Sequence, residues 1–511
     1  MVAGAASDLV VRTNSGELRG ARENGVAVFR GVPYATAPVG PLRFAPAQAA
    51  PAWSGVRDAT QDGPVAPQGR SRLAHVMGDF ERPQSEDCLT LTVWTPDPKP
   101  APAPTLAQGK GGRPVLVWIH GGAFSSGAGS LPWYSGESFA RQGGLVAVSI
   151  NYRLGALGFL CLPGISDGNL GLLDQIAALR WVKSNIRAFG GDPDNVTVVG
   201  QSAGAGSIAA MMTMPAARGL FRRAILQSTP FGRTARGRED AQRIGRRLLE
   251  VLGLKDGEAG RLRDLPVKDF LAAQGELGRL EKKFADAAAP FGLVIDGKTI
   301  PGEILGSLKS GAGKDIDVMI GTTREEMTAF YAIDKDVMAA DETKATPLFE
   351  AMFKAEAPAY LDETRRLRAA KTGAALLEAL FTDRVFRMGS LRHAEYQAAH
   401  GRPAYVYQFD WQAPGGLQSC HCLEIPFVFD NFPNWPAAPM LTGANTDELA
   451  GLARAMHGAW TEFARSGNPN HDALPSWLPY EPAQRITMRF DSVIGPVGDL
   501  AGLNWRKPWP D

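Results

Sequence analysis

The sequence predicts an α/β fold in which a mostly parallel central sheet is covered by helices on both faces. Several short runs consist almost entirely of apolar residues, and strands that are apolar on both faces are typical of a sheet buried from both sides. Between two of these runs, segment 170–189 has apolar residues at helical spacing. The order strand, helix, strand indicates parallel pairing. The apolar runs are 115–119, 145–150, 196–199, 224–226 and 318–320.

Length and composition favour one large globular unit. The chain has 511 residues, of which 44% are hydrophobic and 21% charged, an ordinary globular mixture that can form a large core. No internal repeat or sharp boundary divides it, so we expect a single domain over residues 1–511. Segments 235–290 and 335–400 have charged helical patterns without a strand pattern. We expect both to be helical insertions over the functional edge of the sheet.

The composition argues against several classes of protein. The formal net charge is +1 without blocks of like charge, so no nucleic-acid partner is expected. No apolar run reaches about 18 residues, so no membrane span is expected. The four cysteines are too few for a disulfide framework, and unmodified structural thiols are consistent with a reducing compartment. Two of them flank His421, but the other histidines are scattered, so no metal site is expected. The cysteines are Cys88, Cys161, Cys420 and Cys422.

The strongest functional signal is the motif Gly-Gln-Ser-Ala-Gly at 200–204. It follows the apolar run 196–199 directly and precedes small residues that can begin a helix. In this context G-x-S-x-G forms a nucleophile elbow, a tight turn that strains the serine backbone and exposes its hydroxyl. Glycines are needed because a Cβ would clash where strand and helix approach, and the helix amino terminus favours developing negative charge. The motif therefore predicts that Ser202 is a nucleophile.

A second motif, His-Gly-Gly-Ala at 120–123, ends the apolar run 115–119. Attack on a carbonyl creates an oxyanion, which backbone N–H groups stabilise. Glycine lets the backbone approach that oxygen closely, and glycine-rich strand ends of this kind form oxyanion holes. We therefore expect the amides of Gly121, Gly122 and Ala203 to be the donors.

These motifs, with others along the chain, resemble the type-B carboxylesterases, the family that includes cholinesterases and bacterial p-nitrobenzyl esterases. The resemblance covers nearly the whole chain and implies an α/β-hydrolase fold that hydrolyses esters. The other matching segments are FRGVPYA at 29–35, PLRF at 41–44, SEDCL at 85–89, NYRLG at 151–155, GNLGLLDQ at 168–175, FGGDP at 189–193 and FARSGNP at 463–469.

A nucleophilic serine needs a base, and the base needs an acid that orients it. The segment HCLEIPFVF at 421–429 is similar to the family's catalytic-histidine segment. The resemblance therefore implies that His421 is the base. Cys422 stands where the family usually has glycine, which adds bulk beside the imidazole. His393 and His457 lie in helical patterns and are expected to be structural or exposed.

The acid comes from a segment that is similar to the family pattern G-T-T-R-D-E-G. Here the segment is GTTREEM at 321–327, and by that register Glu326 is the acid. Glu325 stands where the family has aspartate, and we expect it to be solvated. Met327 replaces the final glycine. The chain order Ser, Glu, His is the order expected for this fold.

Other residues match the family around the triad. Ser228 matches a serine often placed near the triad, where it would support the catalytic residues; the alternative is an ordinary hydroxyl at a strand end. Two pairs match paired charges of the family, and we expect structural ion pairs rather than catalytic groups. The pairs are Arg43 with Glu86, and Arg153 with Asp174.

The resemblance also suggests where the acyl group of a substrate binds. In cholinesterases two phenylalanines narrow the acyl pocket shortly before the motif V-I-D-G, which is 294–297 here. Counting back without gaps places Ala287 and Ala289, with Phe291 beside them, at the substrate. Acyl groups of butyrate size or larger would then be preferred over acetate; the alternative is a helix end that touches no substrate. A cholinesterase is not expected, because 54–87 has no tryptophan for a quaternary ammonium.

Together these residues predict a carboxylic ester hydrolase that acts on small-molecule esters. Its Ser-His-Glu triad would work through an acyl-enzyme intermediate without metal or organic cofactor. The same triad permits amidase, lactonase or thioesterase activity, and the fold does not decide between them. A non-catalytic binding relative would lack the serine or the histidine, and both are present.

Overall fold

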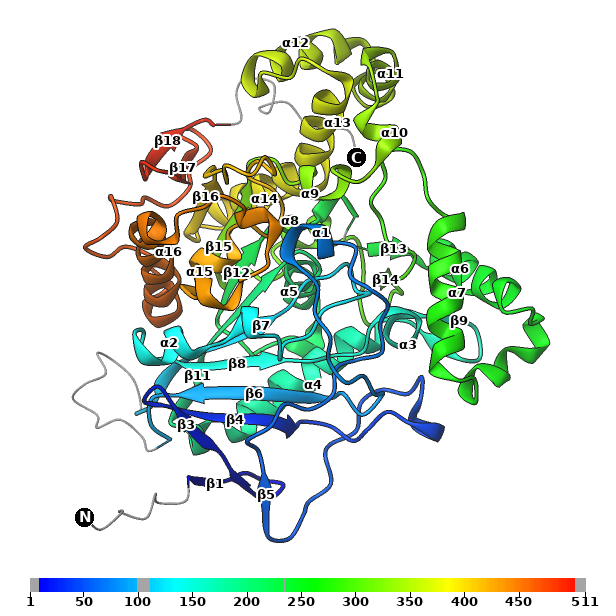
Figure 1. The fold of residues 1–511 in the computed structure, drawn as a ribbon, viewed down its shortest axis with the longest axis vertical. Helices are drawn as coiled ribbons and strands as arrows, with labels where there is room; N and C mark the ends of the chain where they lie inside the picture. Colours follow the sequence, from blue (N-terminus) through cyan, green and yellow to red (C-terminus); the bar gives the residue numbers. More distant parts are fainter. Residues whose placement is uncertain (1–8, 99–110, 234, 501–511) are drawn as a thin grey trace.

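The computed structural model describes residues 9–98, 111–233 and 235–500. At its centre is an 11-stranded sheet, in the order β18-β17-β16-β15-β12-β11-β7-β8-β6-β4-β3 (Figure 1). The strands from β17 to β8 pair in parallel, and antiparallel pairs flank them at both ends. The predicted α/β fold with a mostly parallel sheet is therefore confirmed. The strands are β3 (Ala21–Glu23), β4 (Val26–Pro33), β6 (Thr90–Thr95), β7 (Arg113–Ile119), β8 (Val146–Ile150), β11 (Gly191–Gln201), β12 (Arg223–Gln227), β15 (Asp317–Thr323), β16 (Ala404–Phe409), β17 (Ile486–Phe490) and β18 (Gly495–Gly498).

Both faces of this sheet are buried. Along β7, Val117 and Ile119 belong to one hydrophobic cluster, while Leu116 and Trp118 belong to another on the opposite face. Helices cover each face, so all positions of β7 after Arg113 are buried, and this explains the continuous apolar runs in the sequence. One face is covered by α4 (Leu170–Asn185), α5 (Ala203–Thr213) and α14 (Met388–Ala399), and the other by α2 (Glu137–Arg141), α15 (Ile425–Phe429) and α16 (Thr446–Ser466).

Segment 235–290 differs in one respect from its predicted helical character. Its first three described residues form strand β13 (Ala235–Gly237), which pairs in parallel with β14 (Leu293–Ile295). Such a short strand depends on a partner more than 50 residues away rather than on local patterning, so the expectation of no strand here was wrong. The helices of this segment are α6 (Arg238–Val251) and α7 (Val267–Leu280), with a 3₁₀ segment, η7 (Asp256–Arg263), between them.

Segment 335–400 is helical, and much of it stands above the sheet at the top of Figure 1. A π-helical turn, η9 (Asp383–Arg387), joins its last two helices. The preceding helices are α10 (Lys335–Met338), α11 (Glu342–Phe353), α12 (Ala357–Arg368) and α13 (Gly373–Thr382). The remaining strands and α-helices are β1 (Val10–Arg12), β2 (Glu17–Arg19), β5 (Val56–Asp58), β9 (Cys161–Leu162), β10 (Ser166–Asp167), α1 (Ala74–Met77), α3 (Gly155–Phe159), α8 (Ile304–Lys309) and α9 (Thr328–Tyr331).

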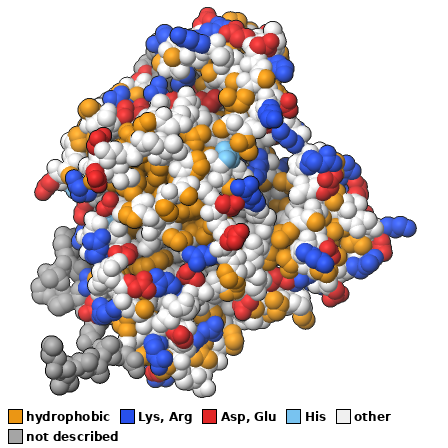
Figure 2. All heavy atoms as spheres, in the orientation of Figure 1, with side chains coloured by type: hydrophobic (Ala, Val, Ile, Leu, Met, Phe, Trp, Pro, Cys, Tyr) orange, Lys and Arg blue, Asp and Glu red, His pale blue; other side chains and the backbone are white. Residues whose placement is uncertain are grey.

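The distribution of surface charge and the state of the cysteines agree with the near-zero net charge and the small number of cysteines in the sequence. Acidic and basic side chains are interspersed over the face that Figure 2 shows. All four cysteines are buried and free. Within residues 9–98, 111–233 and 235–500, no helix combines the length and hydropathy of a membrane-spanning segment. Both expected ion pairs form: Arg43 with Glu86, and Arg153 with Asp174, whose closest atoms are 2.7 Å apart.

Candidate active site

The elbow motif lies between β11 and α5 and has the geometry that its glycines require. Ser202 has φ 56° and ψ −122°, and its N–H donates to the carbonyl of Gln227 at 2.9 Å, which ties the turn to β12. A Cβ on Gly200 would lie 2.6 Å from the carbonyl carbon of Gly204. A Cβ on Gly204 would lie 2.0 Å from the carbonyl oxygen of Ile119 at the end of β7. Neither glycine can gain a side chain without moving the strand or the helix.

The glycine-rich end of β7 lies directly against this elbow. A Cβ on Gly121 would lie 3.0 Å from the Cβ of Ser202. Gly122 has φ 110°, and a Cβ there would lie 2.0 Å from the carbonyl oxygen of Ser126. The amides of Gly121, Gly122 and Ala203 make no hydrogen bond to any residue that the structure describes. The expected donors thus gather beside the serine with their N–H groups available.

A histidine and a carboxylate meet behind the serine. His421, which follows β16, places Nδ1 at 2.5 Å from Oε2 of Glu326, which follows β15. Both side chains are fully buried. The second carboxylate oxygen, Oε1, accepts from the N–H of Thr323 at 2.9 Å. The rings of Phe330 and Phe386 lie 5.2 and 5.0 Å from the imidazole, centroid to centroid. All seven histidines are described, and none of the other six contacts a carboxylate.

One face of the imidazole is contacted by a residue that the sequence did not point to. The amide nitrogen Nε2 of Gln201 lies 3.1 Å from Nε2 and 3.5 Å from Nδ1 of His421, so it packs over the ring. A carboxylate oxygen accepts hydrogen bonds, so Nδ1 carries the proton toward Glu326 and Nε2 is the unprotonated nitrogen. The hydroxyl of Ser202 makes no hydrogen bond within the described residues. In the sequence, the one feature that could have pointed to Gln201 is its position directly before Ser202 in the elbow motif.

Glu325 is not solvated, contrary to the expectation. It is 7% exposed, and its carboxylate accepts from the N–H of Ser419 at 3.2 Å and lies 2.9 Å from Nε of Arg324. Burial raises the pKa of this carboxyl. The segment that covers it precedes His421 and is about 90 residues away in sequence, so local patterning could not reveal its burial. Glu325 contacts that segment through Gln412 and Ser419 rather than the imidazole of His421, and anchors it.

The two departures from the family's glycines have different consequences. Met327 has φ −76°, so this position needs no glycine, and its N–H donates to Oγ1 of Thr382 at 3.0 Å. Cys422 has φ 78°, in the left-handed region that glycine favours, and it is buried. A side chain in that region costs about 1–3 kcal/mol of strain. The backbone turn after the histidine is therefore kept although its glycine is absent.

Ser228 is buried at the end of β12 but is not joined to the triad. Its N–H donates to the carbonyl of Gly321 at 2.8 Å, which ties β12 to β15. Its hydroxyl has no hydrogen-bond partner among the described residues. The structure therefore does not bring Ser228 into hydrogen-bond contact with Ser202 or His421.

A second buried carboxyl lies near the triad. Glu424 is fully buried, and its Oε1 accepts from Nε2 of Gln227 at 3.0 Å. Burial, together with the negative charge of Glu326, raises its pKa to about 7. Glu424 lies in the segment that begins with His421, but only tertiary packing places its carboxyl out of water.

The elbow opens into a cavity of about 420 Å³. Ser202 and Ala203 line it, and Ala287, Ala289 and Phe291 form part of its wall. Helix α7 ends at Leu280, so the alanine-rich segment is not the end of a helix. The structure thus brings the expected acyl-site residues to the same cavity as the serine. An adjoining cavity of about 460 Å³ shares this wall.

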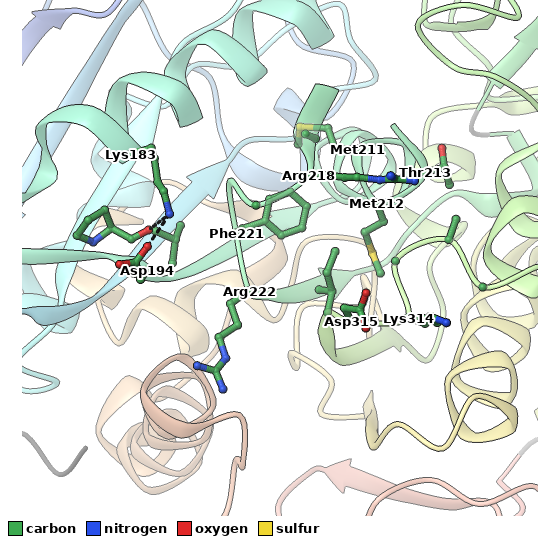
Figure 3. A pocket seen from close by; sticks show the side chains of 18 residues that line it. Lys183, Asp194, Met211, Met212, Thr213, Arg218, Phe221, Arg222, Lys314 and Asp315 are labelled. Atoms are coloured by element: carbon green, nitrogen blue, oxygen red, sulfur yellow. Dashed lines mark hydrogen bonds and ion pairs between the residues drawn. The ribbon is translucent and has the colours of Figure 1, made fainter. Parts of the chain in front are cut away.

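A larger cavity, of about 670 Å³, lies at the opposite end of the parallel strands (Figure 3). It is lined by residues at the amino ends of β11 and β12 and at the end of α5, and none of the expected catalytic residues is among them. Lys183 is tied there to Asp194 at 2.7 Å. Among the described residues, no group of three His, Cys, Asp or Glu side chains is arranged to hold a metal ion.

Comparison with known proteins gives one consistent result. The Carboxylesterase family profile matches residues 7–494. Phenmedipham hydrolase from Pseudarthrobacter oxydans is 41% identical over 508 residues, which covers 98% of this chain and 97% of that protein. Para-nitrobenzyl esterase from Bacillus subtilis is 39% identical over 506 residues, with 98% of each chain covered. The crystal structure of the Geobacillus stearothermophilus carboxylesterase EST55 at pH 6.2 has a TM-score of 0.84 at 39% identity, covering 96% of this chain and 98% of that one.

Proposed function

The chain belongs to the carboxylesterase family and is a carboxylic ester hydrolase, and on this premise we propose that Ser202, His421 and Glu326 carry out the reaction. The observation that supports this assignment most directly is the 2.5 Å contact of His421 with Glu326 beside a strained serine turn. A buried carboxylate at Nδ1 selects the tautomer whose Nε2 can accept a proton. The reaction is the transfer of an acyl group first to serine and then to water.

The first half of the cycle forms the acyl-enzyme. The hydroxyl oxygen of Ser202 attacks the ester carbonyl while its proton passes to Nε2 of His421. The tetrahedral intermediate places its negative charge on the former carbonyl oxygen. The amides of Gly121, Gly122 and Ala203 stabilise that oxyanion, since none donates elsewhere among the described residues. His421 then gives the proton to the leaving alcohol.

The second half of the cycle repeats these steps with water. His421 takes a proton from the water that attacks the acyl-enzyme, and the same amides stabilise the second oxyanion. The carboxylic acid leaves when the proton returns from His421 to Ser202. Throughout, Glu326 stabilises the positive charge that the imidazole gains in each transition state. No step requires a metal or an organic cofactor.

One hydrogen bond must form for this cycle to begin, because proton transfer needs Nε2 of His421 to accept from the hydroxyl of Ser202. The Gln201 amide nitrogen lies over the ring, 3.1 Å from Nε2 and 3.5 Å from Nδ1, so it leaves the in-plane acceptor position of Nε2 open. Catalytic hydrogen bonds are often long or misaligned before substrate binds and tighten in the complex. The hydroxyl of Ser202 therefore takes up this hydrogen bond when substrate fills the cavity.

The test is a matched pair of serine variants assayed on an ester and its amide analogue. Ser202→Ala should lower kcat for 4-nitrophenyl butyrate to less than about a thousandth of wild type while leaving the melting temperature unchanged. Ser207→Ala is the control: Ser207 is also buried in α5, and its hydroxyl lacks a partner among the described residues. Greater residual activity in Ser202→Ala would contradict the nucleophile. Faster turnover of butyryl 4-nitroanilide than of the ester would contradict ester hydrolysis as the main reaction.

A further inference from the structure

The cavity that contains Ser202 has a strongly cationic wall. Four basic side chains line it, and within the described residues Asp286 is the one acidic side chain that does so. This excess contrasts with the whole chain, whose formal net charge is +1. A cleft lined by one sign of charge raises the local concentration of ligands of the opposite sign. The four basic residues are Arg233, Arg236, Lys283 and Arg384.

Two of these cations are occupied by local partners. Arg236 lies 2.8 Å from Asp240 and donates to the carbonyl of Ala289 at 2.8 Å. Arg233 lies 3.2 Å from Asp286, and its side chain is 20% exposed. These contacts hold segment 286–291 in place beside the serine. The carboxylate of Asp286 is therefore already paired with Arg233 before any substrate enters.

Arg384 has no carboxylate partner among the described residues and is exposed. It lies in the π-helical turn η9, and such turns occur frequently at functional sites. Its guanidinium carbon lies 6.0 Å from the ring centroid of Phe381, and that of Arg233 lies 5.5 Å from the same centroid. Two guanidinium groups thus contact one buried ring at the edge of the cavity. A planar guanidinium is suited to bidentate recognition of a carboxylate.

The electrostatics of Arg233 point in the same direction. Burial is the main cause that lowers the pKa of this guanidinium; Asp286 raises the pKa, and the positive charges of Arg384 and Arg72 lower it by smaller amounts. The charged form of Arg233 is therefore disfavoured chiefly by its removal from water. A second anion at the wall would stabilise that charged form.

We propose that the preferred ester has an acyl group that ends in a carboxylate, which Arg384 binds together with Arg233 at the cavity wall. The substrate class is the half-ester of a dicarboxylic acid. The inference rests on the proposed ester hydrolysis at Ser202. The acyl side of the ester is assigned because Arg233 bonds to Asp286, which adjoins Ala287 in the wall proposed for the acyl group.

The experiment compares esters of equal acyl length that differ in terminal charge. The probes are the 4-nitrophenyl half-esters of adipic and suberic acid, with 4-nitrophenyl hexanoate and octanoate as neutral counterparts. In Arg384→Gln, kcat/KM for the half-esters should fall about tenfold while the neutral esters stay within about twofold of wild type. Arg384→Glu should lower the half-ester activity further, and Arg384→Lys should restore part of it. Wild-type kcat/KM should fall with added NaCl for the half-esters alone.

The control variant is Arg246→Gln, because Arg246 is an exposed arginine of α6 that does not line the cavity. Equal losses for charged and neutral esters in Arg384→Gln, or no change in either, would overturn the inference. A dependence on Arg384 confined to the butyrate ester of 4-hydroxybenzoate, whose carboxylate is on the alcohol, would overturn the acyl assignment. If wild type does not hydrolyse the neutral esters through Ser202, the proposed function itself fails, so the two failures are distinguishable.

Discussion

The active-site cavity has two walls that are built in different ways. The catalytic wall consists of strand ends and tight turns, where Ser202, Ala123 and Cys422 have φ values of 56°, 53° and 78°. The substrate wall is segment 281–292, which lies between α7 and β14 without regular secondary structure. Long arginines from other segments hold it: Nη1 of Arg72 donates to the carbonyl of Ala287 at 3.0 Å.

This difference shows where substitutions can change substrate specificity without abolishing catalysis. Strain at the catalytic wall persists because surrounding strands and helices over-determine each backbone angle. A Cβ added to any of the glycines there would lie 2.0–2.7 Å from a backbone atom, so a substitution must move the main chain. At the substrate wall, arginine side chains from other segments hold the backbone through the carbonyls of Ala287 and Ala289, and no strand or helix of the wall has to move when a side chain changes. We therefore expect substitutions at the first wall to abolish activity and substitutions at the second to redirect it.

The largest effect expected at the catalytic wall separates two adjacent carboxylates. Glu326→Gln should lower kcat about ten-thousandfold, because an amide cannot stabilise the imidazolium and favours the wrong tautomer. Glu325→Gln should lower kcat less than about tenfold, since Glu325 contacts Ser419 and Arg324 rather than His421. Steady-state kinetics of both variants check the difference. The assignment of Glu326 is wrong if Glu325→Gln is the more damaging change.

A second effect tests the steric basis of the elbow. Gly204→Ala adds a Cβ that would lie 2.0 Å from the carbonyl oxygen of Ile119, so α5 and β7 must separate. A displacement of about 1 Å at the nucleophile should lower kcat/KM at least a hundredfold. Gly451→Ala in α16 is the matched control, because its Cβ would meet nothing within 4 Å. Wild-type activity in Gly204→Ala would show that the elbow tolerates this movement.

The same distinction explains what the sequence could predict. Ser202 and the oxyanion glycines lie in motifs of four or five residues, each directly after an apolar strand pattern, so their arrangement could be predicted. Glu326 and His421 were found through the family resemblance, and their 2.5 Å contact requires the ends of β15 and β16 to be neighbours. Local patterning could not place Gln201 against the imidazole, because that contact depends on how the segment after β16 packs.

The failed expectations have a common physical cause. Glu325 was expected in water, but Ser419, which donates to its carboxylate, follows more than 90 residues later in the chain. β13 depends on β14, which is also distant in sequence. In both cases burial or pairing is decided by a segment that is distant in the sequence rather than by the residue's own neighbours.

At the substrate wall we expect a change of preference rather than a loss. Ala287→Phe or Ala289→Phe should fill the cavity and shift the acyl preference of neutral esters from butyrate or longer toward acetate. Each methylene that no longer fits removes up to about 0.8 kcal/mol, or about fourfold in kcat/KM when it is realised in the transition state. The measurement is kcat/KM over 4-nitrophenyl acetate to octanoate. A wild type that prefers acetate, or an unchanged profile in both variants, would contradict the proposed acyl wall.

The smallest effect concerns stability rather than rate and tests how completely water is excluded from the catalytic wall. Burial raises the pKa of Glu424 to about 7 from a usual value of 4.5. Between these two pH values the folded protein keeps a proton that the unfolded chain has lost. The stability contributed by this proton is complete below about pH 4.5 and is lost as pH rises through about 7.

The variant Glu424→Gln tests this effect, because its amide keeps an oxygen that accepts from Gln227 but cannot ionise. Its melting temperature should therefore fall less than that of wild type between pH 5 and pH 8. If the melting temperatures of the two proteins fall equally with pH, water reaches this carboxyl. The wall behind His421 would then be less completely desolvated than its burial indicates.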